Sequence, residues 1–466
     1  MGNRGSVPEP PRGVNAARAF ASLGAPVKPL PDRLEIATRG PIDAEVRPPG
    51  SKSITNRALV AAALARGESE LQGVLRSDDT QVMQACLAAL GVAIEAGPEA
   101  EAWKIVGSAG RLRAAPEPLH TGNSGTTARF LSAAATLADA PVVIDGSERM
   151  RERPIRDLVD ALRQLGAPVE VLGRAGCPPL RVQGGGLPGG KATIDASRSS
   201  QYVSAVLLAA PCAERDVDLV FENEALVSAP YVDLTLELMR AFGAEAEWNT
   251  SGGIHVPAGR GYRGRSYAIE PDASAAAYPF CAAAISGGRV RVLGIPAASI
   301  QADLALLPIL SRMGCQVHRE AGAIELRGPV RPERLRGVDV DMNELPDAAL
   351  ALAVTALFAE SPTTIRNVAN LRIKETDRLA ALETELRRLG ARAEAGPDWL
   401  RIEPLPEVTS ETRRSSQTAT EIETYDDHRM AMSFALAGLR LPGVVIRDPG
   451  CVSKTWPGFF AFLESL

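Results

Sequence analysis

The sequence predicts an α/β fold in which one supersecondary unit is copied several times and packed into two lobes. Five amphipathic, helix-like runs end in a glycine and continue into an apolar stretch. These glycines are Gly91, Gly166, Gly243, Gly314 and Gly390, separated by 75, 77, 71 and 76 residues. A near-constant period indicates repeated units, and this period is too long for a tetratricopeptide or ankyrin array.

Each unit is interpreted as a helix, a glycine cap and a strand. In the unit around Gly166, Leu158, Leu162 and Leu165 recur at helical spacing, and the glycine can adopt the left-handed conformation that follows a last helical turn. Residues 168–172 are then extended and largely apolar. Alternatively, the Leu-Gly pairs only end unrelated helices. That interpretation accounts poorly for their regular spacing.

The composition fits a two-domain protein with a large core. The chain has 466 residues, 45% of them hydrophobic, and a net charge of −5, which argues against a general nucleic-acid binder. Its longest apolar run, 348–359, is shorter than the roughly 20 residues of a membrane span. Residues 1–33 are rich in Pro, Gly and Arg and predict a disordered tail, whose opening MGNRGS also fits a myristoylation pattern.

The cysteines and histidines indicate a compartment and argue against a metal site. Six scattered cysteines without a CxxC pair are typical of a reducing cytoplasm, where we expect this protein. None of the four histidines has metal-ligand spacing from another histidine or from a cysteine, so we expect no metal.

The stretch 49–57, PGSKSITNR, runs into an apolar helix and suggests an anion site. Ser51 can cap the helix, and Ser53 and Arg57 are four residues apart on one face. Lys52 lies in the first turn, where a cation is unfavourable unless an anion is bound. An ordinary capped helix with solvated charges is the alternative.

Three further stretches offer polar groups beside helices. In 121–129, TGNSGTTAR, Gly125 allows a ligand to approach the backbone and Asn123 is a donor. In 199–201, two serines and a glutamine can cap a helix or bind a phosphate or polyol. In 147–156, SERMRERPIR, four arginines gather around one turn, and a solvated charge run is the simpler interpretation.

Two carboxylates are candidates for proton transfer. Asp347 begins an apolar helix, where it can act as a cap or as a proton acceptor. In NLRIKETDR, Lys374 and Arg378 are four residues apart and would repel each other on one helix face. Glu375 can serve as their acidic neighbour or as an acid held beside two cations.

Cations outnumber carboxylates across these motifs. His428 and Arg429 begin the helix after YDD, and Lys454 follows in the loop CVSKTWPGF. The cations are Lys52, Arg57, Arg149, Lys374, Arg378, Arg429 and Lys454, against Asp347 and Glu375. This balance predicts substrates that carry several negative charges, with phosphate and carboxylate groups as candidates.

Taken together, the motifs resemble those of the 5-enolpyruvylshikimate-3-phosphate (EPSP) synthase, or 3-phosphoshikimate 1-carboxyvinyltransferase, family. PGSKSITNR, TGNSGTTAR, RPIRDLVDALRQLG, SSQ, LPDAA, RIKETDRL, YDDHRMAM and SKTWP occur in the family's order over about residues 34–466. The resemblance implies two lobes, each of three βαβαββ repeats with buried helices. It divides them at 34–50 plus 271–466 and at 51–270, with the active site in a cleft that closes on substrate.

The implied reaction transfers the enolpyruvyl group of phosphoenolpyruvate to the 5-hydroxyl of shikimate 3-phosphate through a tetrahedral adduct, and releases phosphate. It belongs to the shikimate pathway, which leads to chorismate and the aromatic amino acids. Asp347 is the implied proton acceptor and Glu375 the donor, with Lys52 near enough to tune or relay. The resemblance implies a monomer with no metal or organic cofactor and no nucleic-acid or membrane partner.

The resemblance also assigns two binding sets. Shikimate 3-phosphate would be held by Lys52, Ser53, Arg57, Ser199, Ser200, Gln201, Ser228, Tyr231, Asp347, Asn370 and Lys374. Phosphoenolpyruvate would be held by Lys52, Asn123, Gly125, Arg149, Gln201, Arg378, Arg429 and Lys454. Because Gly125 is retained, inhibition by glyphosate is expected. Residues 408–420 depart from the family pattern and are expected to form a solvated insertion.

Three alternative functions are weaker. UDP-N-acetylglucosamine 1-carboxyvinyltransferases resemble this chain but use a cysteine in the loop that corresponds to 120–129, and no cysteine lies between Cys86 and Cys177. RNA 3'-terminal phosphate cyclases form a nucleotidyl-histidine, for which His428 is the one candidate. A non-catalytic anion-binding protein of the same fold would not need both carboxylates.

Overall fold

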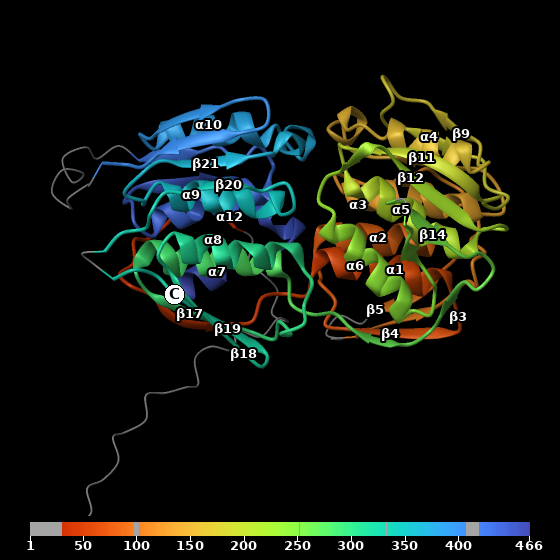
Figure 1. Cartoon of the computed structure of the whole chain (residues 1–466), viewed down its shortest axis with the longest axis horizontal. Coiled ribbons are helices and arrows are strands. Elements are labelled where there is room, and N and C mark those ends of the chain that lie inside the picture. Colours follow the sequence, from red (N-terminus) through yellow and green to blue (C-terminus); the bar gives the residue numbers. More distant parts are fainter. Residues whose placement is uncertain (1–29, 97–101, 251, 331–332, 407–418) are drawn as a thin grey trace, which may run out of the picture.

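Two lobes, each with its own hydrophobic core, lie side by side (Figure 1). The computed structural model describes residues 30–96, 102–250, 252–330, 333–406 and 419–466. The myristoylation-like motif and most of the predicted insertion at 408–420 lie outside these ranges. We call the lobe that contains α7 to α13 lobe 1, and the lobe that contains α1 to α6 lobe 2.

The helices are of two types, inner and outer. The inner helices are apolar on nearly all sides, as is typical of helices surrounded by protein. They are α1 (Lys52–Leu64), α3 (Gly125–Ala134), α5 (Ser200–Ala209), α7 (Ala273–Ser286), α9 (Ala349–Ala356) and α12 (His428–Gly438). The outer helices bury one face and are α2 (Asp78–Ala89), α4 (Arg156–Gln164), α6 (Pro230–Ala241), α8 (Leu306–Arg312) and α10 (Arg378–Arg388). The helix α13 (Phe459–Ser465) follows near the carboxyl end.

The predicted glycine caps are confirmed. The glycines that follow the five outer helices have left-handed φ angles of 85°, 88°, 82°, 109° and 93° in chain order. A strand follows each of them: β5 (Ala93–Ala96), β9 (Val169–Val171), β13 (Glu247–Trp248), β18 (Gln316–Glu320) and β22 (Arg392–Ala395). The sequence period therefore reflects one repeated structural unit.

The remaining strands complete the repeats. In lobe 2 they are β3 (Ala65–Arg66), β4 (Glu68–Gln72), β6 (Ala102–Val106), β7 (Leu119–His120), β8 (Val142–Asp145), β10 (Leu180–Val182), β11 (Gly190–Ala196), β12 (Val217–Leu226), β14 (Ile254–Val256), β15 (Tyr262–Arg263) and β16 (Ser266–Ala268). In lobe 1 they are β1 (Arg33–Glu35), β2 (Asp43–Val46), β17 (Arg289–Leu293), β19 (Ala323–Arg327), β20 (Asp339–Asp341), β21 (Thr363–Arg366), β23 (Leu400–Glu403), β24 (Thr420–Ile422) and β25 (Val444–Arg447).

Five sheets share one topology, in which a parallel pair is followed by two antiparallel neighbours. Their orders are β16-β4-β6-β5, β7-β8-β10-β9, β11-β12-β14-β13, β2-β17-β19-β18 and β20-β21-β23-β22. In the sixth sheet, β24 pairs in parallel with β25, and β1 from the other end of the chain pairs antiparallel with β25. The βαβαββ topology is thus confirmed in five sheets, and the two chain ends together build a sixth sheet of three strands. Strands β15 and β3 form a separate parallel pair.

The chain passes between the lobes at two adjacent points. Gly50 and Pro271 form an isolated antiparallel bridge, and the Ser51 amide donates to the Glu270 carbonyl at 2.9 Å. A Cβ on Gly50 would lie 2.0 Å from the Gly73 carbonyl oxygen, so only glycine fits at this crossing. The core of lobe 2 draws on residues 54–269 and that of lobe 1 on 36–46 and 273–463. On this basis we propose the lobe boundaries at 50/51 and 270/271.

Described structure begins inside two segments that were predicted to be irregular. Leu30 packs against the lobe 1 core and Arg33 begins β1, so ordered structure starts within the predicted tail of residues 1–33. Similarly, Thr420 begins β24 within the predicted insertion. Both β1 and β24 pair with β25. This pairing allows a strand to form where the local sequence is not apolar enough to predict one.

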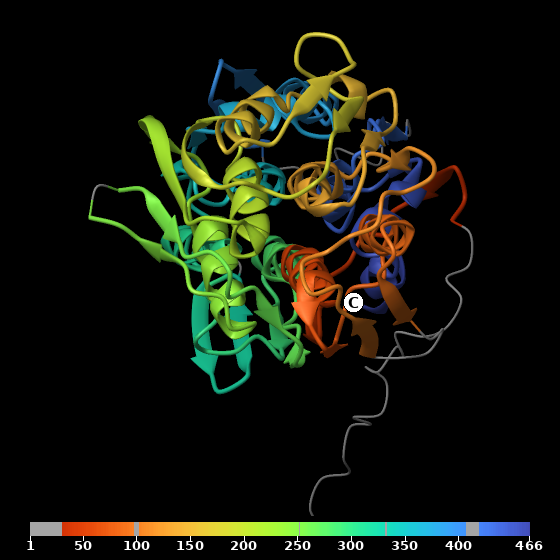
Figure 2. The same cartoon turned by 90° about the vertical axis from the view of Figure 1, so that its right-hand side faces the viewer.

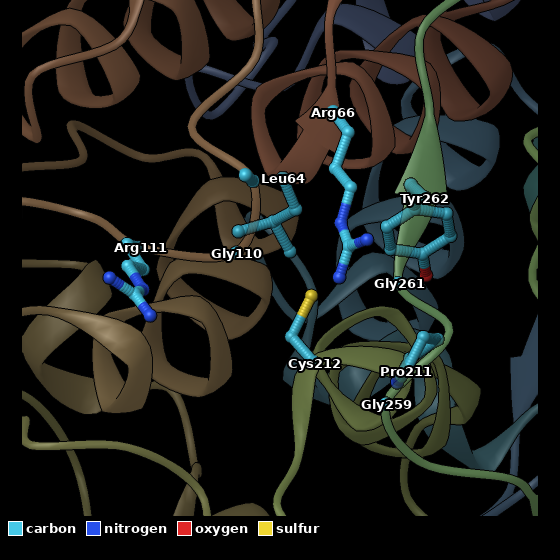
Figure 3. Close-up of a pocket in the computed structure, with 10 residues that line it drawn as sticks. Leu64, Arg66, Gly110, Arg111, Pro211, Cys212, Gly259, Gly261 and Tyr262 are labelled. Carbon is cyan, nitrogen blue, oxygen red and sulfur yellow. The ribbon is translucent and has the colours of Figure 1, made fainter.

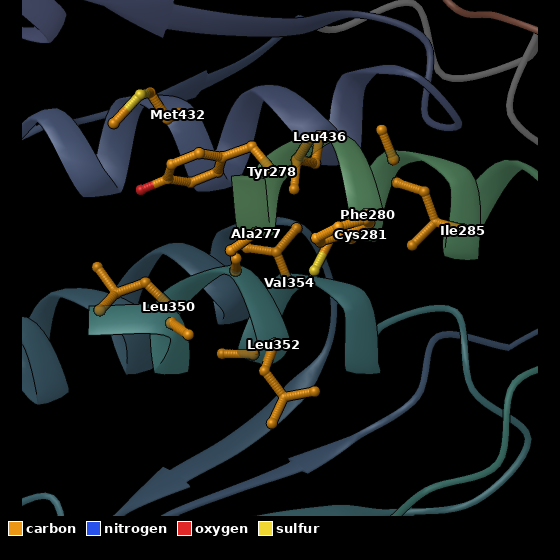
Figure 4. Packing of buried hydrophobic residues seen from close by; sticks show 14 of the residues in the cluster. Ala277, Tyr278, Phe280, Cys281, Ile285, Leu350, Leu352, Val354, Met432 and Leu436 are labelled. Carbon is orange, nitrogen blue, oxygen red and sulfur yellow. The ribbon is translucent and has the colours of Figure 1, made fainter. Parts of the chain in front are cut away.

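The inner helices of lobe 1 pack directly on one another. In Figure 4, Tyr278 and Phe280 of α7 lie between Val354 of α9 and Leu436 of α12. Figure 2 views lobe 2 from its outer side, with several helices nearly end-on and strands around them. The apolar run that we predicted to be a core helix is α9, and no helix of the described ranges is long and apolar enough to cross a membrane. This packing fixes the N-terminal ends of the inner helices.

Candidate active site

One pocket is lined by side chains from both lobes. Its lining residues are Lys52, Asp79, Gly125, Thr126, Arg153, Gln201, Asp347, Lys374, Glu375, Arg378, His428 and Arg429. The first turns of α1, α3, α5 and α12 supply half of this set. Backbone N–H groups without helical partners, together with the helix dipoles, favour anions at such ends.

Positive charge exceeds negative charge in this pocket. The cations of the lining are Lys52, Arg153, Lys374, Arg378 and Arg429, and the carboxylates are Asp79, Asp347 and Glu375. Lys454 adds a sixth cation, because its Nζ lies 3.0 Å from Glu375 Oε1. A buried excess of cations is costly without an anionic partner, so the pocket is suited to a ligand with several negative charges.

Arg378 links the carboxylates of the pocket. Its side chain is 1% exposed and donates to Asp427 at 2.7 and 3.1 Å, to Glu375 at 3.0 Å and to Asp347 at 3.1 Å. Burial lowers the pKa of Arg378, but the Asp427, Glu375 and Asp347 carboxylates outweigh it and raise that pKa above its usual value. The guanidinium therefore stays charged and holds the carboxylates together.

Asp347 faces the pocket and does not cap its helix. It lies in the 3₁₀ helix Pro346–Ala348 without a capping hydrogen bond, and its Oδ2 accepts from Arg429 at 2.8 Å. Burial alone would raise the pKa of Asp347, but Arg429 and Lys374 outweigh it and hold that pKa well below its usual range. Of the two roles that the sequence left open, the structure therefore excludes the cap.

Glu375 is held between cations from three separate segments. Its Oε2 accepts from Arg378, Lys454 contacts its Oε1, and Arg153 lies 3.9 Å away. Burial alone would raise the pKa of Glu375, but Lys454 and Arg378 outweigh it and hold that pKa well below its usual range. Burial also lowers the pKa of Lys374 to about 8.

The prediction that Lys374 and Arg378 share one helix face is wrong, although, besides burial, the Arg378 charge still lowers the pKa of Lys374. The 3₁₀ helix Ala369–Ile373 ends before Lys374, and α10 begins only at Arg378, capped by Asp377. Because a turn separates the two cations, each reaches the pocket from its own direction.

The arginine run places Arg153, and not Arg149, in the pocket. Arg153 is 4% exposed and donates to the Asn123 carbonyl at 3.1 Å, whereas the Arg149 side chain is 33% exposed and outside the lining. The intervening 3₁₀ turn Met150–Glu152 and the following Pro154 direct the two side chains differently. Of the two arginines, Arg153 therefore lines the pocket, and Arg149, which was predicted for the phosphoenolpyruvate set, does not.

Arg57 is buried without a carboxylate partner among the described residues. It donates to Thr235 Oγ1 at 2.7 Å, to the Ser53 carbonyl at 2.9 Å, and to Ser204 Oγ and the Tyr231 carbonyl at 3.2 Å. Burial lowers its pKa to about 10, so it remains charged at neutral pH. Neutral acceptors leave this charge uncompensated, which favours an anion nearby.

Polar groups at the α3 and α5 helix starts connect with one another. Ser199 caps α5 by accepting from the Gln201 amide at 3.2 Å, as one of the two sequence interpretations expected. The Gln201 side chain accepts from Arg129 at 2.5 Å and donates to Thr126 at 3.1 Å. Ser200 is buried in the first turn of α5. This arrangement places Gln201 in the pocket lining.

Several predicted residues bridge the lobes. The Asn123 carbonyl accepts from Lys454 at 2.9 Å, and Ser228 Oγ donates to the Asn343 carbonyl at 3.3 Å. Asn370 is buried near the same 3₁₀ turn as Lys374, with no hydrogen bond to its Oδ1. These contacts bring residues that are distant in the sequence to one gap.

Sequence analysis missed Asp79, Arg153 and Asp303. Asp79 lies 3.5 Å from Lys52, in the first turn of α2, where adjacent aspartates look like ordinary N-terminal helix acids. Asp303 accepts from Tyr231 and from Ser274, both at 2.7 Å. Tyr231 belongs to lobe 2 and Asp303 to lobe 1, and no sequence pattern indicates such a contact.

Asp303→Asn is expected to change how stability depends on pH. Burial, with the nearby Asp347 charge, raises the pKa of Asp303 to about 6, so the folded protein binds this proton more tightly than the unfolded chain. The wild type therefore loses the associated stability as pH rises through 6, and the variant does not. Urea unfolding of both proteins at pH 5 and pH 8 should show a relative gain of about 1 kcal/mol for the variant at pH 8. The same pH dependence in both proteins would contradict this assignment.

The pocket is nearly filled by its own ion pairs. Its free volume is about 30 Å³, which holds little more than a water molecule. A larger cavity of about 160 Å³ lies in lobe 2, near the carboxyl ends of α1 and α5, and is lined by Arg66, Arg111, Cys212 and Tyr262 among others (Figure 3). It contains none of the predicted site residues. A ligand can enter the charged pocket only if its ion pairs open or the lobes separate.

Comparisons with known proteins identify the family. The sequence profile described as EPSP synthase (3-phosphoshikimate 1-carboxyvinyltransferase) matches residues 36–463. The 3-phosphoshikimate 1-carboxyvinyltransferase of Nostoc punctiforme is 45% identical over 431 residues, covering 92% of this chain and 98% of that one. The chain belongs to the EPSP synthase family. The enzyme of the same name from Yersinia pseudotuberculosis is also 45% identical, over 433 residues, covering 92% of this chain and 97% of its own.

Solved structures support the membership of this chain in the EPSP synthase family. EPSP synthase from Acinetobacter baumannii has a TM-score of 0.73 at 27% identity, covering 93% of this chain and 97% of that one. The enolpyruvyl transferase NikO from Streptomyces tendae, at 19% identity, has a TM-score of 0.72 and shares the fold. The resemblance inferred from the motifs, and the two-lobed α/β fold that it implied, are confirmed.

Proposed function

We propose that this protein transfers the enolpyruvyl group of phosphoenolpyruvate to the 5-hydroxyl of shikimate 3-phosphate, the shikimate-pathway step of its family. The observation that carries the proposal is a pocket between the lobes with six cations around two proton-transfer carboxylates. We further propose that it acts in the cytoplasm, which its six unpaired thiols favour. A monomer is proposed from the family resemblance.

The cations have a specific task in this reaction. Two phosphorylated substrates repel each other, and their approach requires that the pocket neutralise both. We assign the two binding sets as predicted from the sequence, with Arg153 in place of Arg149 and Lys52 shared between the sets. Arg57 suits a phosphate, because it is a buried cation without a carboxylate partner among the described residues.

The proton transfers balance over two half-reactions. In the addition, Asp347 takes the proton of the 5-hydroxyl as its oxygen bonds to C2. Glu375, which takes up a proton once the substrates draw Lys454 and Arg378 away from it, gives that proton to C3. In the elimination, C3 returns its proton to Glu375, the bond from C2 to the phosphate oxygen breaks, and the proton held by Asp347 leaves with the phosphate. Lys52 lines the same pocket as both carboxylates and can tune or relay these transfers.

Substrate binding also activates the carboxylates. Arg429 and Arg378 are paired with Asp347 in the structure, which makes that carboxylate a weak base. Phosphate and carboxylate oxygens of the substrates compete for these guanidinium groups. As the pairs open, the pKa of Asp347 rises towards the value that a general base needs.

A phosphate-release assay tests the proposed function. Purified protein with phosphoenolpyruvate and shikimate 3-phosphate should release phosphate, and shikimate in place of shikimate 3-phosphate should give far less, because it lacks the group that the cations neutralise. UDP-N-acetylglucosamine as acceptor should give no release. Absence of phosphate release with the proposed pair of substrates would contradict the proposal.

Gly125→Ala is expected to weaken the binding of both phosphoenolpyruvate and its mimic glyphosate. A Cβ at this position would lie 2.6 Å from Arg129 Nη1 and 2.7 Å from Arg153 Nη2, so it would displace guanidinium groups of the anion site. The KM for phosphoenolpyruvate and the inhibition constant for glyphosate should each rise by about 10-fold or more, as expected for loss of a charge-assisted hydrogen bond. Gly40→Ala is the control, because nothing lies within 4 Å of its added Cβ and its φ angle is not left-handed. No glyphosate inhibition of the wild type at millimolar levels would contradict the prediction.

A further inference from the structure

Arg149 makes a three-way contact that joins the two lobes. Its Nε donates to the Glu375 carbonyl at 3.0 Å and its Nη2 to the Lys374 carbonyl at 3.0 Å. Its Nη1 donates to Glu152 of the same turn at 2.9 Å. Arg149 follows β8 in lobe 2, whereas the two carbonyls belong to lobe 1. The planar guanidinium thus spans two consecutive peptide groups of the other lobe.

The two carbonyls depend on this contact. Residues 374–376 form a turn between the 3₁₀ helix Ala369–Ile373 and α10, outside any strand or helix. No backbone amide of the described residues donates to the carbonyl of Lys374 or of Glu375. Buried or half-buried carbonyls need a donor, and here the donor comes from the opposite lobe.

The same two residues direct their side chains into the pocket. Glu375 reaches Arg378 and Lys454, and Lys374 lines the pocket beside it. A short turn without backbone pairing has little intrinsic rigidity, so the orientation of both side chains depends on what holds their peptide groups. Arg149 holds both peptide groups at once and can do so only while the lobes are in contact.

We propose that Arg149 is a positioning residue for the reaction, because its guanidinium orients the Lys374–Glu375 turn when the lobes meet. Contact between the lobes is thereby coupled to assembly of the proton-transfer site. The inference rests on the proposed function and goes beyond it. Arg149 does not contact the pocket, so its effect is exerted through Glu375 and Lys374.

Variants at Arg149 give a distinct kinetic pattern. Arg149→Met should lower kcat by about 10- to 100-fold, as expected for a displaced catalytic group, and change the KM for phosphoenolpyruvate less than about 3-fold. Arg149→Lys can donate to one carbonyl, since an ammonium lacks the two parallel N–H groups, and should be intermediate. Arg151→Met is the matched control: this exposed arginine of the same turn pairs with Asp145, and its loss should leave kcat within about 2-fold.

Hydrogen–deuterium exchange supplies a readout besides activity. In the presence of both substrates, the amides of Ala380 and Ala381, which donate to Asp377 at the end of this turn, should exchange faster in Arg149→Met than in the wild type or in Arg151→Met. The pH profile of kcat should also shift in Arg149→Met alone, because a freed Glu375 loses its fixed distance to Lys454. Arg149→Lys keeps the test available if the methionine variant fails to fold.

Three outcomes would overturn the inference. Wild-type kcat and wild-type exchange of the Ala380 and Ala381 amides in the Arg149 variants would exclude a positioning role. A rise of more than about 10-fold in the KM for phosphoenolpyruvate at unchanged kcat would instead make Arg149 a direct ligand. If Arg151→Met lowered kcat and sped up exchange as much as Arg149→Met, loss of a surface charge would explain both variants. A wild type without phosphate release would contradict the proposed function, while the exchange measurement would still test the contact.

Discussion

Asp347→Asn is expected to lower kcat by about 10²- to 10⁴-fold, the usual contribution of a positioned general base. The asparagine side chain nearly preserves the volume of aspartate and can still accept a hydrogen bond from Arg378 or Arg429. It cannot take the proton of the attacking hydroxyl. Because binding groups remain in place, the KM for shikimate 3-phosphate should change far less than kcat.

Steady-state phosphate release measures this effect. Asp339→Asn is the control, since this exposed carboxylate of lobe 1 pairs with Arg366 on the surface and should retain wild-type turnover. Glu375→Gln should lose activity on a similar scale, because it removes the proton donor to C3. Full turnover in Asp347→Asn would remove this residue from the mechanism and favour the non-catalytic, anion-binding interpretation.

Arg378→Met is expected to destabilise the folded protein by about 3 to 5 kcal/mol, the cost of removing one partner from a buried ion-pair network. The Arg378 side chain is 1% exposed, and its main partner Asp427 is fully buried. Without the guanidinium, Asp427 is left as a buried charge, and Glu375 loses one of its cations. Methionine fills much of the space but supplies no donor.

Urea unfolding measures this loss of stability when the slope of the unfolding free energy against urea concentration is the same in the variant and the wild type. Arg366→Met is the matched control, since Arg366 makes a two-pronged contact with Asp339 on the surface, with side chains 53% and 57% exposed. Its loss should cost at most about 1 kcal/mol. If the two variants unfold at the same urea concentration, the Arg378 network does not stabilise the fold as described.

Local features of the fold could be predicted from the sequence. A glycine after an amphipathic run has few alternatives to a left-handed cap, and all five predicted caps are present. Ser51 and Ser199 cap their helices as expected, because a hydroxyl before an apolar helix satisfies nearby amides. The buried stripe of α4 also follows directly from the spacing of Leu158 and Leu162.

Contacts between distant segments could not be predicted in this way. Arg149 and Arg153 belong to one run of similar residues, and only the turn between them decides which side chain enters the pocket. Tyr231 and Asp303 are 72 positions apart in the sequence and belong to different lobes, so no local pattern indicates their contact. Lys374 was expected on a helix because its charge spacing suits one, whereas the turn is imposed by tertiary contacts.

The pairing of β1 with β25 has a consequence for how the chain reaches its folded state. Residues 33–35 lie beside residues 445–447, so the sixth sheet can form only after almost the whole polypeptide has left the ribosome. Lobe 2 draws on one uninterrupted stretch and can condense earlier, while the first strands of lobe 1 wait for their partners. Since pairing of such widely separated segments is slow, lobe 1 should set the pace of refolding.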